Sequence, residues 1–455
     1  MPTQGLFFGR KALFLAPRRS VFRRIALFLA FLPTLLFASV PEGSKSPMDS
    51  LKIAAGALPD TAVRSRLAPW SFGVSANVSG LLPMDDICKA IMHNYGCSLY
   101  GVYADYHTSA ADGNAYDADF GYPTLEGGFL FGDYHHIRFF RDEPRLDYNS
   151  GMGYMLALYG GFRRDLFRSK SLAFGYNFEN GIGFCTRPYN TRTNADNEII
   201  GSTYNIYLDI GFYAKYRFAK HWEAALGIDY KHFSNGALDR PNKGANTAGI
   251  TARLNYYPEA FGDPEPVNPD VQEPFRKRFY VELSAGLAAK SLQDDWVINY
   301  WMRDPSDPKY RSSRFPVYGA FTAMVAPMYR YCRRYASGLE LDYTYAPYAS
   351  RIEELDHWRN LYQYKYSRHV LGIGFRHEVF FRHLSLAMGA GWYVFRRMGY
   401  TADVDEKPYY ETIGLRYNFP FSGDRLFIGY NVKAHFTKAD CMQVTLGWRF
   451  GPKAE

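Results

Sequence analysis

Residues 222–234 read WEAALGIDYKHFS, and their side chains alternate between two kinds. The even positions up to 230 are apolar, with an aromatic residue at each end: Trp222, Ala224, Leu226, Ile228 and Tyr230. Most odd positions carry charge or glycine: Glu223, Gly227, Asp229 and Lys231. A period of two predicts a β-strand. Such alternation also suits a soluble sandwich, but aromatic residues at both ends of an apolar stripe are typical of a transmembrane barrel.

The same pattern recurs along the chain, separated by polar, glycine- or proline-bearing breaks. We expect eight strands in the first half, at residues 71–80, 97–107, 127–139, 152–163, 171–186, 203–217, 221–234 and 246–257. Eight more are expected in the second half, at residues 278–289, 315–330, 337–347, 367–380, 383–395, 409–420, 425–437 and 441–450. We therefore predict an all-β protein that forms a transmembrane antiparallel up-and-down β-barrel fold.

The stretch at residues 259–276 is rich in proline and acidic residues. Proline cannot donate to a β-ladder, so this stretch is not a central strand. It predicts a linker between two consecutive eight-stranded barrels. The alternative is one larger barrel of about 16 strands, in which 259–276 would be an ordinary turn.

The N-terminus has the pattern of an export signal. Arg23 and Arg24 precede an apolar run over 25–40 that ends in small residues, which describes a signal peptide over residues 1–40. We expect an N-terminal periplasmic segment at 41–70, a first barrel at 71–258, the linker at 259–276, a second barrel region at 277–450 and a tail at 451–455.

Composition excludes several other classes of protein. The formal net charge is +8, but six basic residues and no acidic ones lie in 1–40, so the mature chain is near 8 − 6 = +2. This removes the argument for a nucleic-acid partner. Beyond the signal no apolar run reaches the length of a transmembrane helix, and the mean hydropathy is −0.31. The five cysteines show no metal-ligand spacing, so we expect no metal and no cofactor; whether Cys88 and Cys97 pair stays open.

The end of the stretch that opens this section carries polar residues on its apolar face. A membrane barrel begins in the periplasm, so the seventh strand ends at the outer leaflet. His232 and Ser234 lie at this end, and as even positions they share the apolar face of the strand. Asn246 begins the next strand on the same face. Serine, histidine and an orienting group are the parts of a nucleophilic hydrolase site. Asn235 and Gly236 offer donors to an oxyanion. The alternative is a hydrogen-bonded loop at the headgroup level, since HFSNG and RPNKG are rich in turn formers.

Residues 231–246, KHFSNGALDRPNKGAN, resemble the active-site segment of the PagL-like lipid A deacylases, the outer-membrane acyloxyacyl hydrolase family, in which a His-x-Ser-Asn run precedes a Pro-Asn-x-Gly loop. NGIGFCTRPY (180–189) and NEIIGSTYNIYLDIG (197–211) are similar to the longer members found in Bacteroidetes, and CMQVTLGWRF (441–450) to their C-terminal extension. The resemblance implies removal of an ester-linked acyl chain from lipid A in the Gram-negative outer membrane. It implies Ser234 as nucleophile, His232 as base and Asn242 as a support of the loop.

One position departs from the family pattern. The best-known members place a glutamate twelve residues after the serine, where this chain has Asn246. An amide can orient an imidazole but cannot stabilise its charge; a loop acid such as Asp239 is the alternative helper. The resemblance implies lipid A or lipopolysaccharide as the partner. The competing hypothesis is a catalytically inactive barrel with a structural or surface-binding role. In the second half, GYNVKAHFTK (429–438) echoes the site segment, but its parity puts His435 and Thr437 on the lumen side.

Overall fold

The computed structural model describes residues 67–140, 149–269, 275–299, 306, 315–435 and 438–452. The expected signal peptide at 1–40, residues 41–66 of the expected segment at 41–70, and residues 453–455 of the expected tail lie outside these residues. Within them, no helix is both long enough and apolar enough to cross a membrane.

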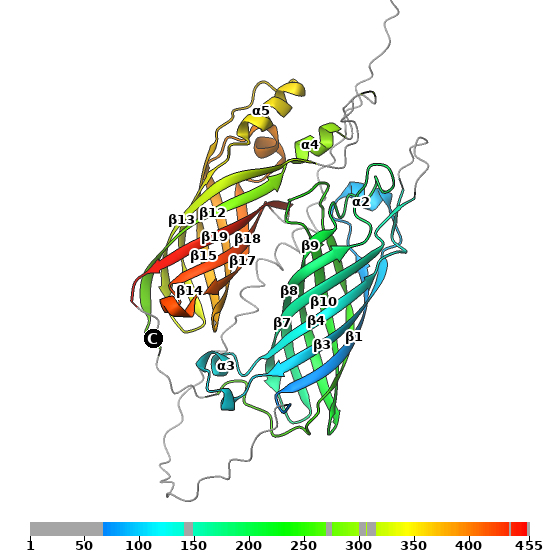
Figure 1. The fold of residues 1–455 in the computed structure, drawn as a ribbon, viewed down its shortest axis with the longest axis vertical. Coiled ribbons are helices and arrows are strands. Elements are labelled where there is room, and N and C mark those ends of the chain that lie inside the picture. Colours follow the sequence, from blue (N-terminus) through cyan, green and yellow to red (C-terminus); the bar gives the residue numbers. More distant parts are fainter. Residues whose placement is uncertain are drawn as a thin grey trace, which may run out of the picture.

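The first half of the chain closes into an eight-stranded antiparallel barrel (Figure 1). Its strands, in chain order, are β1 (Trp70–Leu81), β3 (Gly96–His107), β4 (Thr124–Asp133), β7 (Tyr154–Arg168), β8 (Leu172–Cys185), β9 (Tyr204–Ala219), β10 (Trp222–Ser234) and β11 (Ala245–Tyr256). Strand β1 closes the barrel because it pairs with both β3 and β11. Each strand is long enough to span a tilted hydrocarbon layer.

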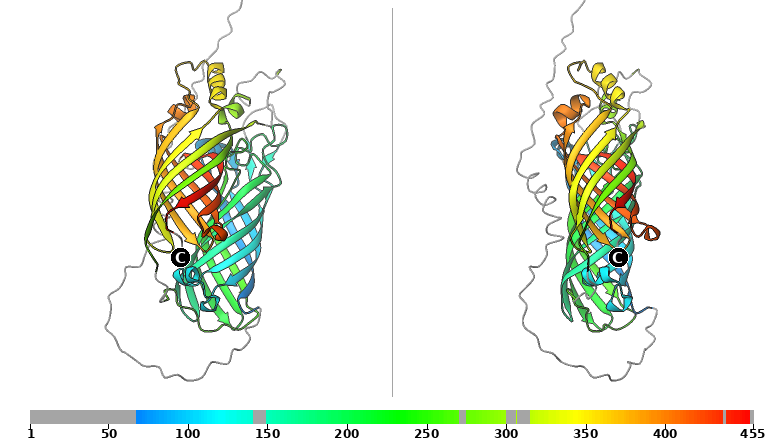
Figure 2. Two further views of the ribbon diagram at one scale, coloured as in Figure 1. Left: turned by 60° about the vertical axis from the view of Figure 1, so that its left-hand side comes forward. Right: turned by 90° about the vertical axis from the view of Figure 1, so that its left-hand side faces the viewer.

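The second half closes into a second eight-stranded antiparallel barrel, seen beside the first in Figures 1 and 2. Its strands are β12 (Arg278–Ser291), β13 (Val317–Arg330), β14 (Tyr335–Tyr345), β15 (His369–Phe381), β16 (Leu384–Phe395), β17 (Tyr409–Asn418), β18 (Leu426–His435) and β19 (Lys438–Phe450). The prediction of two barrels is confirmed, and the alternative of one larger barrel is wrong.

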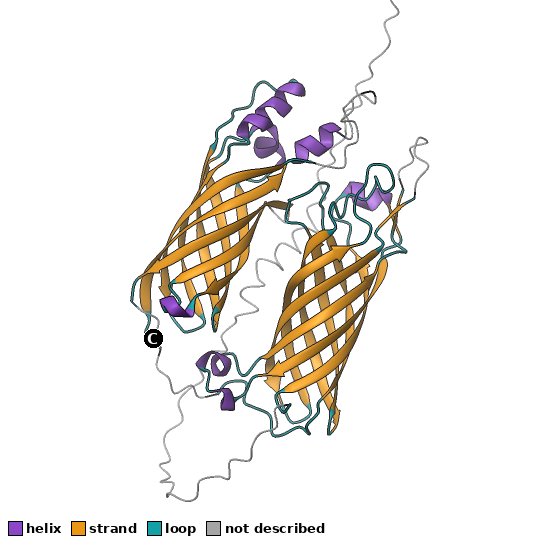
Figure 3. Cartoon of the chain, viewed as in Figure 1, coloured by secondary structure: helices purple, strands orange, loops and turns teal. Residues whose placement is uncertain are grey.

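Short helices lie at the ends of the barrels (Figure 3). The helices are α2 (Asp86–Ile91), α3 (Ala115–Asp119), α4 (Gln293–Val297) and α5 (Ala349–Trp358), with single helical turns at Ala110–Asp112, Thr401–Asp405 and Pro420–Ser422. A small separate sheet joins β2 (Met92–His93), β5 (Arg138–Phe139) and β6 (Ser150–Gly151). All five cysteines are free, so Cys88 and Cys97 do not pair.

The prediction of a strand at 127–139 is wrong at its C-terminal end, because the strand ends six residues earlier, at Asp133. Strand β4 stops at Asp133, and His135 and His136 lie in a turn. Asp133 explains the stop, because its Oδ1 accepts the backbone N–H of His135 at 3.1 Å. An aspartate that bonds the backbone two residues ahead favours a turn over continued strand pairing.

The two faces of each strand differ as the alternation predicts. In β10 the side chains of Trp222, Leu226 and Ile228 are exposed on the outside, whereas Glu223 and Lys231 are buried inside the barrel. An outward apolar band and a polar interior are characteristic of a membrane barrel. The inward register of Lys231 fixes the outward register of its neighbour His232, because a one-residue slip would reverse both.

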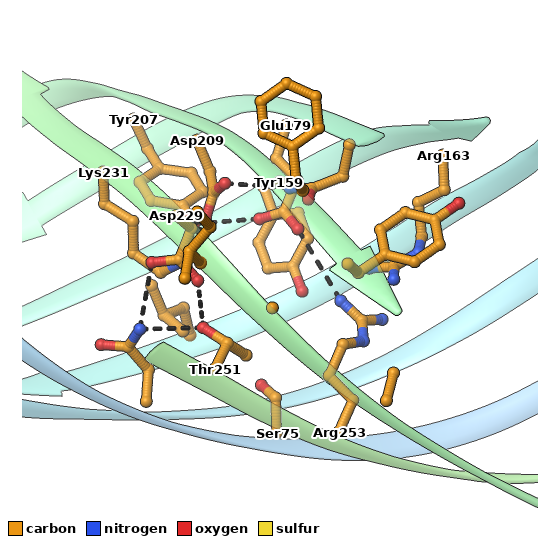
Figure 4. A pocket seen from close by; sticks show the side chains of 18 residues that line it. Ser75, Tyr159, Arg163, Glu179, Tyr207, Asp209, Asp229, Lys231, Thr251 and Arg253 are labelled. Carbon is orange, nitrogen blue, oxygen red and sulfur yellow. Dashed lines mark hydrogen bonds and ion pairs between the residues drawn. The ribbon is translucent and has the colours of Figure 1, made fainter. Parts of the chain in front are cut away.

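Ion pairs and hydrogen bonds fill the first lumen (Figure 4). The ammonium of Lys231 binds Asp209 and lies 3.1 Å from Asp229. Farther along, the guanidinium of Arg253 donates to Glu126 at 2.7 Å. The cavity beside Lys231 and Arg253 measures about 30 Å³, which is room for about two water molecules. The interior of this barrel is therefore a packed core and not a channel.

The two barrels contact each other at the end where β1 begins, which is the periplasmic end of an outer-membrane barrel. Helix α3, in the β3–β4 connection, reaches the second barrel. The guanidinium of Arg382 donates to both oxygens of the fully buried Asp117, at 3.0 and 2.5 Å. Arg333 lies 3.2 Å from Asp119. These pairs join the barrels by specific charged contacts.

Candidate active site

The strand register brings His232 and Asn246 together. They are direct partners in the antiparallel pairing of β10 with β11, one step before that pairing ends at Phe233 and Ala245. Directly paired residues project from the same face of a sheet. Ser234, the last residue of β10, shares that face because it is two positions beyond His232.

The imidazole of His232 bridges the other two side chains. Its Nδ1 lies 2.6 Å from Oδ1 of Asn246, and its Nε2 lies 2.7 Å from Oγ of Ser234. The Asn246 amide is oriented by its Nδ2, which donates to the carbonyl of Gly244 at 3.0 Å. Because Oδ1 can only accept, the ring carries its proton on Nδ1 and presents a lone pair from Nε2 to the serine hydroxyl. This is the tautomer that a general base needs.

The three residues are less open to lipid than the sequence suggests. They lie on the outward-facing side of β10 and β11, as expected, but Ser234 is 7% and Asn246 is 2% exposed, and His232 is half-buried. The three side chains therefore share the outward face but are largely covered by the protein. Gly244 lies against the imidazole, and the residues that follow Ser234 are themselves buried.

The residues after the serine form a tight turn. Leu238 N–H donates to the carbonyl of Asn235 at 3.2 Å, and the two residues between them, Gly236 and Ala237, have φ values of +61° and +74°. Two consecutive positive φ values are those of a type I′ turn. Asn235 is also held by its side chain, whose amide donates to Ser202 Oγ at 2.9 Å.

The Pro-Asn-Lys-Gly stretch at residues 241–244 folds back against this turn. Asn242 Oδ1 accepts the backbone N–H of Asn235 at 3.3 Å, so the predicted loop support by Asn242 has a specific partner. That contact occupies the Asn235 N–H, which was a candidate oxyanion donor. Gly244 has a φ of +78° and lies against the imidazole, where a Cβ atom would approach His232 Cε1 to 2.7 Å.

Comparison with known families gives two matches, one over each barrel. The family model described as "Lipid A 3-O-deacylase (PagL)" matches residues 101–255. The model described as "Acyloxyacyl hydrolase, C-terminal domain" matches residues 271–453. The chain belongs to the PagL-like acyloxyacyl hydrolase family. The family and the two barrels place the protein in the outer membrane of a Gram-negative bacterium.

Solved structures give weaker likenesses. The outer membrane enzyme PagL is 15% identical, with 40% of this chain and 97% of that chain covered and a TM-score of 0.25. The alcaligin outer membrane receptor FauA from Bordetella pertussis is 10% identical, with 84% and 76% covered and a TM-score of 0.23. At these scores neither likeness adds to the family assignment. The comparison with curated protein sequences gave no match.

Sequence reasoning missed several residues around this family's motif. The hydroxyl of Tyr230, which we assigned to the aromatic girdle, donates to Oδ1 of Asn246 and so shares that acceptor with His232. Gly244 is part of the motif, but nothing in the sequence indicates that it contacts the imidazole of His232. Contacts from the second barrel, described below, had no signal either.

Asp239 does not orient the imidazole in this arrangement. Its Oδ1 accepts the backbone N–H of Arg240 at 2.8 Å, and its carbonyl oxygen accepts the Asn235 side-chain amide at 3.3 Å. Burial raises the pKa of the Asp239 carboxyl to about 6, and the Arg240 N–H opposes that shift. Both ring nitrogens of His232 are bonded to Ser234 and Asn246. The aspartate is therefore part of the loop.

Two clusters in the described part of the chain have the composition of a metal site. Asp133, His135 and His136 lie on and after β4, which does not neighbour β10 or β11. Glu406, His435 and Asp440 lie in the second barrel, where Arg396 binds Glu406 and Lys290 binds Asp440. Those cations already neutralise the carboxylates of the second cluster. The first cluster lies away from β10 and β11, so neither cluster adds a metal site to the arrangement of His232, Ser234 and Asn246.

The echo segment of the second barrel behaves as its parity predicts. His435 is 3% exposed, and its Nε2 lies 2.8 Å from the hydroxyl of Tyr393. It is an inward-facing residue of β18, beside the buried Lys433. Thr437 lies outside the described residues. The second barrel therefore does not repeat the outward-facing arrangement of His232 and Ser234.

Proposed function

We propose that the protein is a serine esterase that removes an ester-linked acyl chain from lipid A or a related glycolipid of the outer leaflet. The observation that carries this proposal is the His232 imidazole held between Ser234 Oγ and Asn246 Oδ1. The site lies at the far end of β10 from the periplasm, where lipid A headgroups are found. The family match supplies the substrate class.

The reaction follows from the geometry. Ser234 Oγ attacks the ester carbonyl while His232 Nε2 takes the hydroxyl proton. The tetrahedral intermediate collapses, and the imidazolium returns the proton to the departing sugar hydroxyl. Water, activated by the same nitrogen, then releases the fatty acid from Ser234. Gly236 N–H is our candidate donor to the oxyanion, because the neighbouring N–H of Asn235 is bonded to Asn242.

Asn246 takes the place of an acid without disturbing the tautomer of the ring. In a serine protease, asparagine in place of the triad aspartate reduces turnover because the ring adopts the wrong tautomer. Here the Gly244 carbonyl holds Nδ2, so the amide oxygen faces the ring. Asn246 therefore orients His232 correctly but supplies no full negative charge for the imidazolium. We expect a working esterase that is slower than one with a carboxylate at this position.

The test is mass spectrometry of lipid A from cells that express the wild type, Ser234→Ala or Ser350→Ala. Ser350 is an exposed serine at the start of α5 and serves as the matched control. We expect the wild type and Ser350→Ala to remove one acyl chain and Ser234→Ala to remove none. Acyl loss that survives Ser234→Ala would exclude this site as its source. Unchanged lipid A with the wild type would favour the inactive structural or surface-binding barrel.

A further inference from the structure

The turn that follows the nucleophile lies against the second barrel. At Gly236 a Cβ atom would come within 2.4 Å of Met442 Cγ, so the methionine rests directly on the turn. Met442 is on β19, among residues whose even positions, such as Val444 and Leu446, face outward. The two barrels in Figure 1 therefore meet at the candidate site as well as at the periplasmic end.

Ser291, the last residue of β12, makes two hydrogen bonds to this turn and a third to Arg240, two residues beyond it. Its backbone N–H and its hydroxyl both donate to the carbonyl of Ala237, at 2.7 and 2.9 Å. Its own carbonyl accepts Nε–H of Arg240 at 3.1 Å. Ser291 and Ala237 are both fully buried. Buried hydrogen bonds of this kind resist exchange with water and rigidify the groups that they join.

The carbonyl that Ser291 binds belongs to a strained residue. Ala237 has a φ of +74°, in the left-handed region that residues with a Cβ atom rarely adopt. Such a conformation persists only when its surroundings hold it in place. Two residues, Asn235 and Gly236, separate Ala237 from the candidate nucleophile Ser234, so the N–H of Gly236 lies between them. A relaxation of Ala237 would therefore move the candidate oxyanion donor.

We propose that the second barrel positions the catalytic turn: Ser291 and Arg240 hold Ala237 in its left-handed conformation, so that Gly236 N–H faces the oxyanion. The inference rests on the proposed function and assigns the second barrel a part in it. Ser291 and Arg240 are positioning residues and do not touch the reacting atoms. The arrangement explains why both barrels are in one chain, since the site of one is completed by the other.

The experiment compares full-length wild type, Ser291→Ala/Arg240→Met, the same pair with Ala237→Gly, and Ser284→Ala as control. Ser284 lies on the same strand, and its side chain faces the second lumen. We expect the double variant to lose at least 10-fold in kcat with little change in KM, and to exchange the Leu238 amide hydrogen at least 10-fold faster. Glycine adopts positive φ without strain, so Ala237→Gly should restore most of both quantities.

Each outcome decides separately on the inference and on the proposed function. Wild-type kcat and wild-type hydrogen exchange in the double variant would overturn the positioning role while the esterase stands. Failure of Ala237→Gly to restore either quantity would also overturn it, because the loss would then not pass through the strained residue. If the wild type has no esterase activity the proposed function fails, and the exchange of Leu238 alone still decides whether Ser291 and Arg240 hold the turn.

Discussion

His232 and Asn246 face each other across the pairing of β10 with β11, with 2.6 Å between Nδ1 of the ring and Oδ1 of the amide. The register of two strands, and not a flexible loop, sets this distance. Lys231, anchored to Asp209 inside the barrel, fixes that register from the other face. A site built on strands holds its side chains more accurately than one built on loops.

Asn246→Ala should reduce kcat on the order of 100-fold, because the Nδ1–H of His232 loses its acceptor and the ring loses its orientation. Asn246→Asp, which keeps an acceptor of the same size, should retain more activity than the alanine variant. Steady-state kinetics on purified lipid A measure both. Wild-type kcat in Asn246→Ala would show that the amide does not orient the base.

Gly244→Ala should reduce kcat at least 10-fold, because the new methyl group would meet His232 Cε1. The matched control is Gly113→Ala. Gly113 also has a positive φ, of +62°, but a Cβ atom there meets nothing within 4 Å. Both variants therefore carry similar backbone strain, and only one displaces the imidazole. Equal activities in the two variants would contradict the contact between Gly244 and the ring.

Asp239 gives the stability of the folded state a specific dependence on pH. Burial raises the pKa of its carboxyl to about 6, above the value of about 3.9 in an unfolded chain. Between these values the folded protein binds the proton more tightly, so stability is lost as the pH rises from about 4 to about 6. Asp239→Asn does not titrate. Its urea unfolding midpoint should exceed that of the wild type at pH 8 and approach it at pH 4. A constant difference at all pH values would contradict this account.

The two barrels should remain associated after the chain is cut between them. With a protease site introduced at 270–274, both fragments should co-purify in detergent, and Arg382→Ala should lower the fraction that co-purifies, while the Arg333–Asp119 and Ser291–Ala237 contacts remain. Removing this arginine leaves the buried Asp117 without its partner, at a cost on the order of 3 kcal/mol. Arg425→Ala is the control, since Arg425 donates within the second barrel, to the carbonyl of Gly451. Separation of the wild-type fragments would show that only the linker joins the barrels.

The fold was predictable because each strand meets two different environments. Alternation along 222–234 and its counterparts located all 16 barrel strands, since lipid on one side and a filled lumen on the other leave a period of two. The end of β4 was missed because the Asp133 turn interrupts a run of residues that suits a strand. The short sheet of β2, β5 and β6 was missed because its strands have only two residues each.

The candidate site was predictable only in part. Parity put His232, Ser234 and Asn246 on one face because β10 and β11 are neighbours in the chain. The burial of Ser234 was not predictable, since no local pattern shows how the loop after the strand folds back. No local pattern indicates that Ser291 would meet Ala237, because these residues lie on different barrels. The roles of the three triad residues stay predictions.

The most direct test of the central claim is covalent labelling of Ser234 by a lipid-tailed fluorophosphonate, read by peptide mass spectrometry. These reagents modify a serine hydroxyl only when an adjacent base activates it. We predict a single adduct on the peptide that contains Ser234 in the wild type, and its loss in His232→Ala, with heat-modifiable folded protein in both samples. An adduct on another serine, or equal labelling of Ser234 without His232, would contradict the proposal that this histidine activates this serine.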